Sequence, residues 1–293
     1  MMSFGELFVT DSLIYSSCEF LVVILGRLLG GFPWAQRIYV KSSGTLGLGW
    51  VRLPALLSDD PTAKHYKQLE KSMLSLSRQL AQWVVGLTYD DLPPEVIDRA
   101  KGVTLHSLAS VLLGSQSRSG QQAVQLIKGE ESGVRHGATI MVDGTTVTKG
   151  GAAFANAEMA MSGGKLDSFR MLTHPGTSIL PGAFVGAETA SATGKEFLTG
   201  VAAGYEVMER LASDFIPTVM SRGFHAGPVF GIFGPAIAAA KMLNFTEDQV
   251  NNTIALCVHL AAGNLEGPRN GGRALREGAA VRNAMLAVSM AQM

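Results

Sequence analysis

The sequence predicts a mainly α-helical protein with one small β-hairpin. Apolar residues recur at spacings of three and four over much of the chain. Hydrophobic residues make up 47% of the 293 residues and charged residues only 16%. A hairpin signal stands at Asp143-Gly144, between two β-rich runs. With so few charges, many helices must be apolar on more than one face, as in the interior of a large helical domain.

Charge and cysteine content narrow the classes of function. The formal net charge is zero and the pI is about 7.0. No basic run is dense enough to indicate a nucleic-acid partner or an anionic membrane surface. Cys18 and Cys257 are too few for a disulfide framework, a zinc site or an iron–sulfur cluster. We therefore expect chemistry by side chains, with no metal and no cofactor, in a cytoplasmic protein, with mitochondria as the alternative location.

Residues 1–62 differ in their residue pattern from the rest of the chain. Their apolar run, residues 18–34, is interrupted by Arg27 and is shorter than a membrane span. Glu6 and Asp11 stand where a signal peptide would carry basic residues. We interpret residues 1–62 as an atypical, poorly ordered or loosely docked N-terminal extension. A buried N-terminal anchor and an incorrectly assigned gene start are the alternatives. Residues 63–293 then form the helical domain.

The elements of this domain are expected in a simple order. The apolar spacing predicts a helix from Tyr66 to Gly86, where glycine ends it. Acidic residues followed by Pro93-Pro94 and Glu95 predict the start of a second helix that reaches Gly114. A short helix over 123–127, the hairpin and an alanine-rich helix from Gly151 follow.

The loop after the alanine-rich helix carries the first candidate site residues. Asp167 and His174 lie seven positions apart in a stretch bounded by Gly163-Gly164 and Pro175-Gly176. A carboxylate near an imidazole fixes its tautomer and raises its basicity, which suits a general base. The pair is therefore a catalytic candidate. The alternative is a loop without a catalytic role.

The second candidate is His225, at the start of the stretch 221–245. We expect this stretch to be a loop feeding a buried helix. Gly227, Gly231 and Gly234 carry no side chains, so a backbone or a ligand could approach closely. Unpaired amides around Gly227 would be a place to hold an anion. A core histidine in tight helix packing is the alternative for His225.

A third cluster concentrates charge in the last part of the chain. Arg269 and Arg273 lie in a glycine-rich loop and are the candidates for gripping an anionic substrate, because a guanidinium matches a carboxylate in shape. Arg276, Glu277 and Arg282 come just after this loop. We assign these three to salt bridges at the start of a helix.

These segments together resemble a known family. The runs LDSFRMLTHPGTSILPGAFVGAETA, GKEFLTGVAAGYEVMERLA, RGFHAGPVFGIFGPAIAAAKMLNF and GGRALREGAAVRNA are similar to the MmgE/PrpD family, over residues from about 76 to 293. That family includes 2-methylcitrate dehydratase, cis-aconitate decarboxylase and the alkylcitrate dehydratases of fungal maleic-anhydride pathways. The resemblance implies a helical first domain, a smaller α+β lid domain, a cleft between them and a homodimer. Met293 comes before the lid, so we expect a fragment, one part of a split gene or a subunit of a larger assembly.

The resemblance also assigns roles to residues. Asp167 matches the family's aspartate, His174 its THP histidine and His225 the histidine of its FH motif. Arg273 stands where many members carry a lysine, which keeps the charge but changes its shape. The loop between Asp167 and His174 is shorter than the DFDDT-containing form of the family and lacks the threonine of that motif.

The expected activity is that of a cofactor-independent lyase that removes water from a 2-alkylcitrate such as 2-methylcitrate. Arg269 or Arg273 and the amides around Gly227 would hold the substrate carboxylates. His174 or His225 would remove a proton next to a carboxylate, and the other histidine would protonate the departing hydroxyl group. Asp167 would orient one imidazole. Decarboxylation of a cis-aconitate-like acid and epimerisation are the alternatives within this family. An inactive subunit that binds a full-length relative is the alternative of another class.

Overall fold

Helices account for nearly all of the regular structure. The computed structural model describes residues 74–170, 173–265 and 276–293, so the interpretation of residues 1–62 and the start of the helix predicted from Tyr66 lie outside the described residues. The helices are α4 (Leu76–Gly86), the 3-10 helix η1 (Tyr89–Asp91), α5 (Pro94–Gly114), α6 (Arg118–Glu131), α7 (Lys149–Ser162), α8 (Pro175–Ala190), α9 (Gly194–Ala212), α10 (Ile216–Ser221), α11 (Ala226–Gly231), α12 (Phe233–Met242), α13 (Glu247–Leu260) and α14 (Arg276–Gln292). The mainly helical fold class is confirmed.

The predicted hairpin is present between α6 and α7. Strands β1 (Ala138–Thr139) and β2 (Thr146–Val147) pair antiparallel, with Ala138 opposite Val147. Asp143 shapes the turn, because its carboxylate accepts a hydrogen bond from the Thr145 amide at 3.2 Å. Gly144 follows with a φ of +83°, a conformation that glycine adopts without strain.

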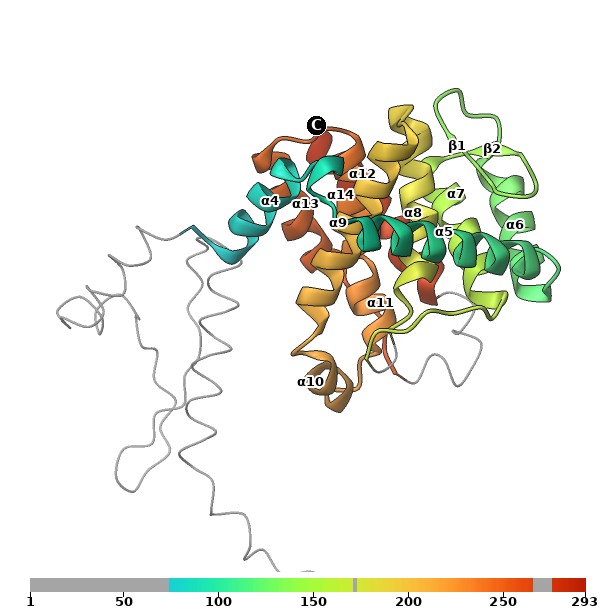
Figure 1. Ribbon diagram of the computed structural model, residues 1–293. Coiled ribbons are helices and arrows are strands. Elements are labelled where there is room, and N and C mark those ends of the chain that lie inside the picture. Colours follow the sequence, from blue (N-terminus) through green and yellow to red (C-terminus); the bar gives the residue numbers. More distant parts are fainter. Residues whose placement is uncertain (1–73, 171–172, 266–275) are drawn as a thin grey trace, which may run out of the picture. The chain divides into compact units, whose positions relative to one another are not determined.

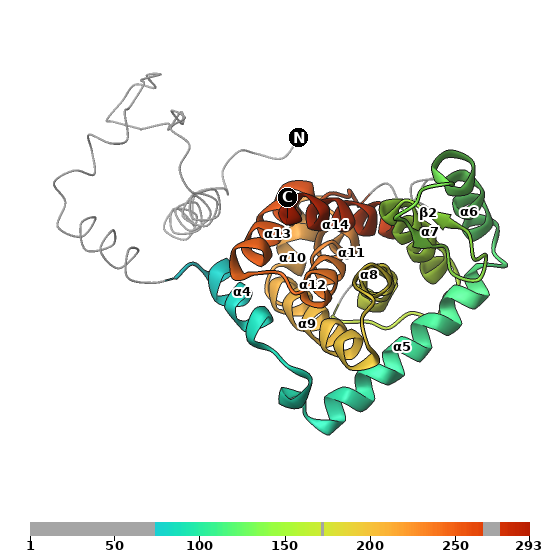
Figure 2. The ribbon, with the colours of Figure 1, turned by 90° about the horizontal axis from the view of Figure 1, so that it is seen from above.

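Helix α8 lies at the centre of the helical assembly. It packs against α5, α7, α9, α11, α12 and α14. Figures 1 and 2 show these helices around it from two directions. The pattern follows from the sequence, since α8 is almost free of charged residues and nearly all of its first two turns is buried. Ser77–Met293, seen by itself, forms one compact unit.

Small residues let neighbouring helices approach closely. Every residue of α7 from Gly151 to Met161 is buried, as the alanine-rich composition predicts. A Cβ added at Gly114 would lie 1.8 Å from the Met159 carbonyl oxygen, so α5 and α7 meet through bare backbone. At Gly234 the close neighbour is a side chain: a Cβ added there would lie 2.4 Å from Cγ1 of Ile179 on α8.

Two expected elements differ from those observed. Helix α6 covers fourteen residues instead of the short helix predicted over 123–127, because Ser117 caps it by accepting a hydrogen bond from the Gly120 amide at 3.0 Å. The stretch 221–245 contains two helices, α11 and α12, in place of one buried helix.

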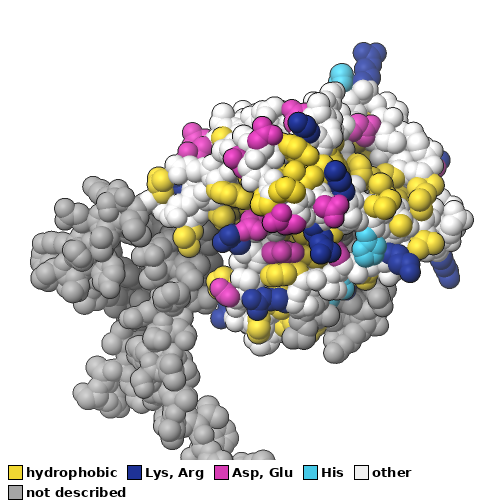
Figure 3. All heavy atoms as spheres, viewed as in Figure 1, with side chains coloured by type: hydrophobic (Ala, Val, Ile, Leu, Met, Phe, Trp, Pro, Cys, Tyr) yellow, Lys and Arg dark blue, Asp and Glu magenta, His cyan; other side chains and the backbone are white. Residues whose placement is uncertain are grey.

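The surface has mixed character. Exposed leucines lie on α5, among them Leu105, Leu112 and Leu113. Figure 3 shows hydrophobic side chains interspersed with charged ones on the face that α5 crosses. Within the described part of the chain, no helix combines the length and the apolar character that crossing a membrane requires.

Cys257 is buried inside the fold. It is 1% exposed, and its Sγ lies 3.9 Å from the Ile232 carbonyl oxygen.

The close contact at Gly114 predicts a stability difference between two glycines of the same helix. Gly114→Ala should lower the free energy of unfolding by about 1–3 kcal/mol, because the new methyl group overlaps the α7 backbone. Gly102→Ala is the matched control: nothing lies within 4 Å of its added Cβ, and alanine favours the helix by up to about 1 kcal/mol. Chemical denaturation of both variants measures the difference. Equal free energies of unfolding would contradict the described contact.

Candidate active site

His174 lies at the start of α8, at the N-cap position. Its Nδ1 is 2.8 Å from the backbone carbonyl oxygen of Asp167 and 3.2 Å from the Ser168 hydroxyl. A carbonyl oxygen only accepts hydrogen bonds, so Nδ1 must carry the proton. The Nε2 atom of the neutral ring therefore keeps its lone pair. His174 is half-buried, so its ring retains access to solvent.

Asp167 positions His174 through its backbone and not through its carboxylate. The carboxylate accepts the Gly176 amide at 2.9 Å and the Tyr205 hydroxyl at 2.7 Å. It thus closes the N-terminus of α8, where unpaired amides favour a negative charge. The expectation that the Asp167 side chain orients an imidazole is corrected accordingly. The carboxylate instead binds the Gly176 amide at the N-terminus of α8 and the Tyr205 hydroxyl.

His225 lies at the N-cap of α11 and is 4% exposed. Its Nδ1 accepts a hydrogen bond from the Gly227 amide at 3.0 Å. The expectation that the Gly227 amide binds a substrate anion does not fit this geometry, because that amide is already paired. An added Cβ at Gly227 would lie 2.9 Å from Oε1 of Glu277, so a side chain fills the space that the missing Cβ leaves.

Arg276 faces the other ring nitrogen of His225. Its Nη1 lies 3.0 Å from Nε2 of His225. A neutral imidazole has one N–H and one acceptor, and a guanidinium only donates. The Gly227 amide at Nδ1 and Arg276 at Nε2 are both donors, so they compete for the single acceptor of the neutral ring. The other Arg276 nitrogens are also paired, because Nε donates to Glu277 and Nη2 lies 3.4 Å from the Met161 sulfur.

The electrostatic surroundings keep His225 neutral. Burial, the positive charge of Arg276 and the proximity of His174 lower the pKa of His225 to about 4. The charge of His174 acts on His225, although the two residues are 51 positions apart in the sequence. His225 is thus neutral at pH 7.

Two buried glutamates belong to the surroundings of Arg276. Glu277 accepts a hydrogen bond from Nε of Arg276 at 2.9 Å, and Glu158 of α7 accepts one from the Gly278 amide at 2.8 Å. Each glutamate is 2% exposed. Burial raises the pKa of Glu158 to about 8, and burial also raises the pKa of Glu277, against the lowering effect of Arg276.

The charged residues of the third cluster divide into two groups. Arg269 and Arg273 lie outside the described residues. The salt bridges predicted for the helix start are present: Arg276 pairs with Glu277 at 2.9 Å, and Arg282 pairs with Glu131 at 2.6 Å. The contact from Arg276 to His225 comes in addition to its salt bridge.

Glu158 and Tyr205 are not among the site residues that the sequence predicts. Glu158 has a signal in the sequence, since it is the only charged residue between Lys149 and Lys165 in a run that must be buried. Tyr205 lies on the amphipathic helix α9 and has no comparable signal. Its hydroxyl becomes visible only once α9 is placed beside the loop that holds Asp167.

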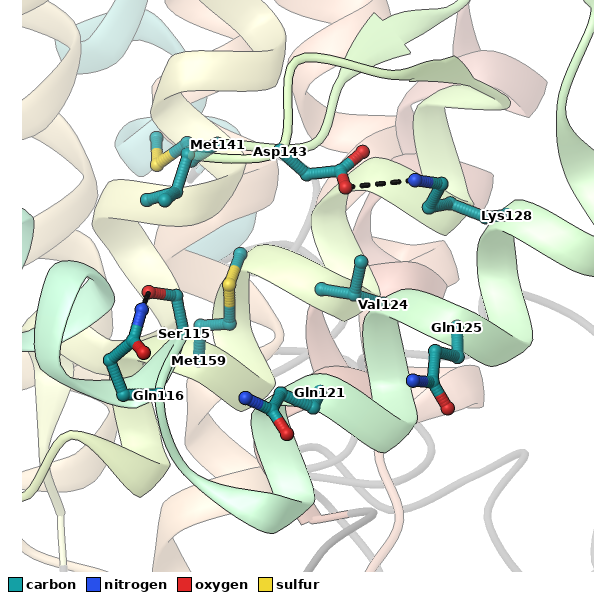
Figure 4. Close-up of a pocket in the computed structure, with 10 residues that line it drawn as sticks. Ser115, Gln116, Gln121, Val124, Gln125, Lys128, Met141, Asp143 and Met159 are labelled. Carbon is teal, nitrogen blue, oxygen red and sulfur yellow. Dashed lines mark hydrogen bonds and ion pairs between the residues drawn. The ribbon is translucent and has the colours of Figure 1, made fainter.

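A pocket of about 490 Å³ lies elsewhere in the fold, between α5, α6, α7 and the hairpin (Figure 4). Gln121, Lys128 and Met159 are among its lining residues. The ammonium group of Lys128 is already paired in this pocket, because its Nζ lies 2.9 Å from the Asp143 carboxylate. Neither histidine of the candidate site lines it. Among the residues for which the structure gives positions, no group of three or more His, Cys, Asp or Glu side chains could hold a metal ion.

Comparison with known proteins gives the family. Residues 78–293 match the MmgE/PrpD N-terminal domain, which is well over half of the chain. This chain belongs to the MmgE/PrpD family. The MmgE/PrpD match covers α5 to α14, and with them every element that positions the two histidines.

Curated relatives of this MmgE/PrpD chain carry the name cis-aconitate decarboxylase. A cis-aconitate decarboxylase-like protein, oryM, from Aspergillus oryzae is 27% identical over 199 residues, 64% of this chain and 41% of the relative. Cis-aconitate decarboxylase from Aspergillus terreus is 24% identical over 72% of this chain and 44% of its own. The human protein of that name is 26% identical over 75% and 46%. The chain thus spans less than half the length of these relatives.

The neutral state of His225 predicts a pH-dependent stability. The unfolded chain protonates this histidine below about pH 6.5, whereas the folded chain does so only near pH 4. The unfolded state therefore binds more protons in this window, and the free energy of unfolding should fall by as much as about 3 kcal/mol as the pH drops from 6.5 to 4. Denaturation at several pH values should show a smaller fall in His225→Gln. His106→Gln, at an exposed position of α5, is the control and should retain the wild-type slope.

Proposed function

We propose that this chain carries the acid-base site of a lyase that decarboxylates a cis-aconitate-like unsaturated tricarboxylate. One observation supports the proposal: the Asp167 carbonyl oxygen fixes the proton of half-buried His174 on Nδ1, which leaves Nε2 for proton transfer, and the charges of His174 and Arg276 both act on His225. A positioned imidazole that transfers a proton, next to a cation that attracts carboxylates, is what such a reaction requires.

The chemistry assigns a role to each group. In an unsaturated tricarboxylate, the bond from a CH2 group to its carboxylate carbon breaks and carbon dioxide leaves. The electron pair moves to form a new double bond, and the far carbon of the original alkene takes up one proton. His174, protonated at Nε2, would deliver that proton. Arg276, which contacts His225, would supply positive charge for a carboxylate that stays on the substrate, and the Asp167 carbonyl oxygen would orient His174.

The names of the curated relatives favour decarboxylation over the removal of water from a 2-alkylcitrate. The Aspergillus and human relatives are named cis-aconitate decarboxylase or cis-aconitate decarboxylase-like. Dehydration remains the second candidate, because the same His174 Nε2 could abstract the proton next to a carboxylate while another acid protonates the departing hydroxyl group. Arg269 and Arg273 keep their proposed role as further carboxylate contacts.

Product analysis tests the proposal. The purified chain, alone and with a full-length family member added, is incubated with cis-aconitate and separately with 2-methylcitrate. Release of carbon dioxide from the first is expected, and His174→Gln should lower kcat by about 10²–10⁴-fold because the proton donor is lost. His106→Gln should retain the wild-type kcat. Loss of water from 2-methylcitrate without carbon dioxide release would favour dehydration, and turnover of neither substrate by a folded chain would overturn the proposal.

A further inference from the structure

Tyr205 of α9 donates a hydrogen bond to the loop that precedes α8. Its hydroxyl lies 2.7 Å from Oδ2 of Asp167. Both carboxylate oxygens of Asp167 also accept the Gly176 amide, each at 2.9 Å. Burial and the negative charge of Asp167 raise the pKa of Tyr205, so its phenol keeps the proton and acts as the donor. Hydrogen bonds to a carboxylate are stronger than those between neutral groups.

Asp167 connects Tyr205 to His174 within a single residue. Its carboxylate is held by the hydroxyl of Tyr205 on α9 and by the amide of Gly176 on α8. Its carbonyl oxygen lies 2.8 Å from Nδ1 of His174. Because the side chain is held from both helices, the backbone of Asp167 is placed relative to both. The carbonyl oxygen that fixes the His174 proton on Nδ1 therefore depends on the bond from Tyr205.

The missing side chain of Gly176 leaves room for this arrangement. A Cβ added at Gly176 would lie 2.9 Å from the Tyr205 hydroxyl and 3.0 Å from Oδ2 of Asp167. Both distances are shorter than or at the limit of ordinary packing, so α8 meets this pair of side chains through bare backbone. The hydroxyl, the carboxylate and the helix N-terminus thus lie in direct contact.

The other group near Nδ1 of His174 does not select a tautomer. The Ser168 hydroxyl lies 3.2 Å from Nδ1, and a hydroxyl can either donate or accept. Ser168 is also exposed, so water competes for it. The carbonyl oxygen of Asp167 accepts only, and it is the group that determines where the proton of His174 lies.

We propose that Tyr205 is a positioning residue for proton transfer by His174: its hydroxyl holds Asp167, whose carbonyl oxygen holds His174 in the Nδ1–H tautomer. Tyr205 acts through Asp167 and contacts no reacting group. The inference rests on the proposed function for the role of His174, whereas the tautomer can be measured without turnover. It extends the candidate site to α9.

Nitrogen-15 NMR of the full chain tests the inference without substrate. At about pH 8.5 a histidine with the ordinary pKa of about 6.5 is neutral, so the spectrum reports which ring nitrogen carries the proton. The chain has six histidines, and the signals lost in His174→Gln assign His174. The wild-type ring should carry its proton on Nδ1. Tyr205→Phe should give a mixture of both tautomers, because the carbonyl oxygen is no longer held in place. A wild-type proton on Nε2 would overturn the inference.

Tyr89→Phe is the matched control, because it removes a hydroxyl from a half-buried tyrosine whose ring faces Lys195 instead. It should keep the wild-type tautomer of His174. Asp167→Ala removes the connecting side chain, so it should give a mixture by itself, and adding Tyr205→Phe should change nothing further. Retention of the Nδ1–H tautomer in Tyr205→Phe, or in Asp167→Ala if the first variant does not fold, would overturn the inference. A shift in Tyr89→Phe would do the same.

Kinetics with cis-aconitate provides the second readout. Tyr205→Phe should lower kcat by up to about 10²-fold with KM nearly unchanged, because His174 is misplaced while the groups that attract the substrate remain. A purely structural role of Tyr205 would reduce the folded fraction and leave the tautomer of the folded molecules as in the wild type. A raised KM with unchanged kcat would contradict the positioning role. A tautomer shift in a chain without turnover would support the connection through Asp167 and count against the proposed reaction alone.

Discussion

The close approach of helices through small residues is the constraint on which the remaining structure depends. Where α7 and α14 meet, an added Cβ at Gly278 would lie 2.7 Å from Oε1 of Glu158. Only because that side chain is absent can the Gly278 amide donate to the buried carboxyl group. The same packing leaves polar groups no solvent partners, so each must find one within the protein. The hydrogen bonds around Glu158 and Glu277 follow from this requirement.

The candidate site is built where two helices begin. His174 and His225 occupy the N-cap positions of α8 and α11, and each is held by main-chain groups: the Asp167 carbonyl oxygen for one and the Gly227 amide for the other. The carbonyl oxygen fixes the proton of His174 on Nδ1, whereas His225 meets a donor at each ring nitrogen, the Gly227 amide at Nδ1 and Arg276 at Nε2. Two chemically equal side chains thereby become different, one with an acceptor left at Nε2 and one whose ring nitrogens both face donors.

Much of the fold could be predicted from the sequence because its signals are local. The acidic and proline-rich start of α5, the Asp143-Gly144 turn and the alanine-rich composition of α7 each determine structure within a few residues. The boundary of α6 is harder to predict, since it depends on one hydrogen bond that the Ser117 side chain accepts from the Gly120 amide.

The candidate site could be predicted only in part. The two histidines stand out in the sequence beside glycine and proline. The use of the Asp167 carboxylate depends on where α9 brings the Tyr205 hydroxyl, and the contact of Arg276 with His225 joins residues 51 positions apart. Such contacts are set by the packing of whole helices, and no local pattern encodes them. Glu158 is the exception, since an isolated charge in a buried run indicates a paired or protonated group.

The burial of Cys257 has a chemical consequence for a protein with the proposed activity. A double bond conjugated to a carboxylate, as in the expected product, is an electrophile that adds to thiolate anions. Cys257 is 1% exposed, and burial raises the pKa of its thiol, so the sulfur stays protonated and out of reach. At this cysteine the fold therefore protects the chain from alkylation by the compound it would release.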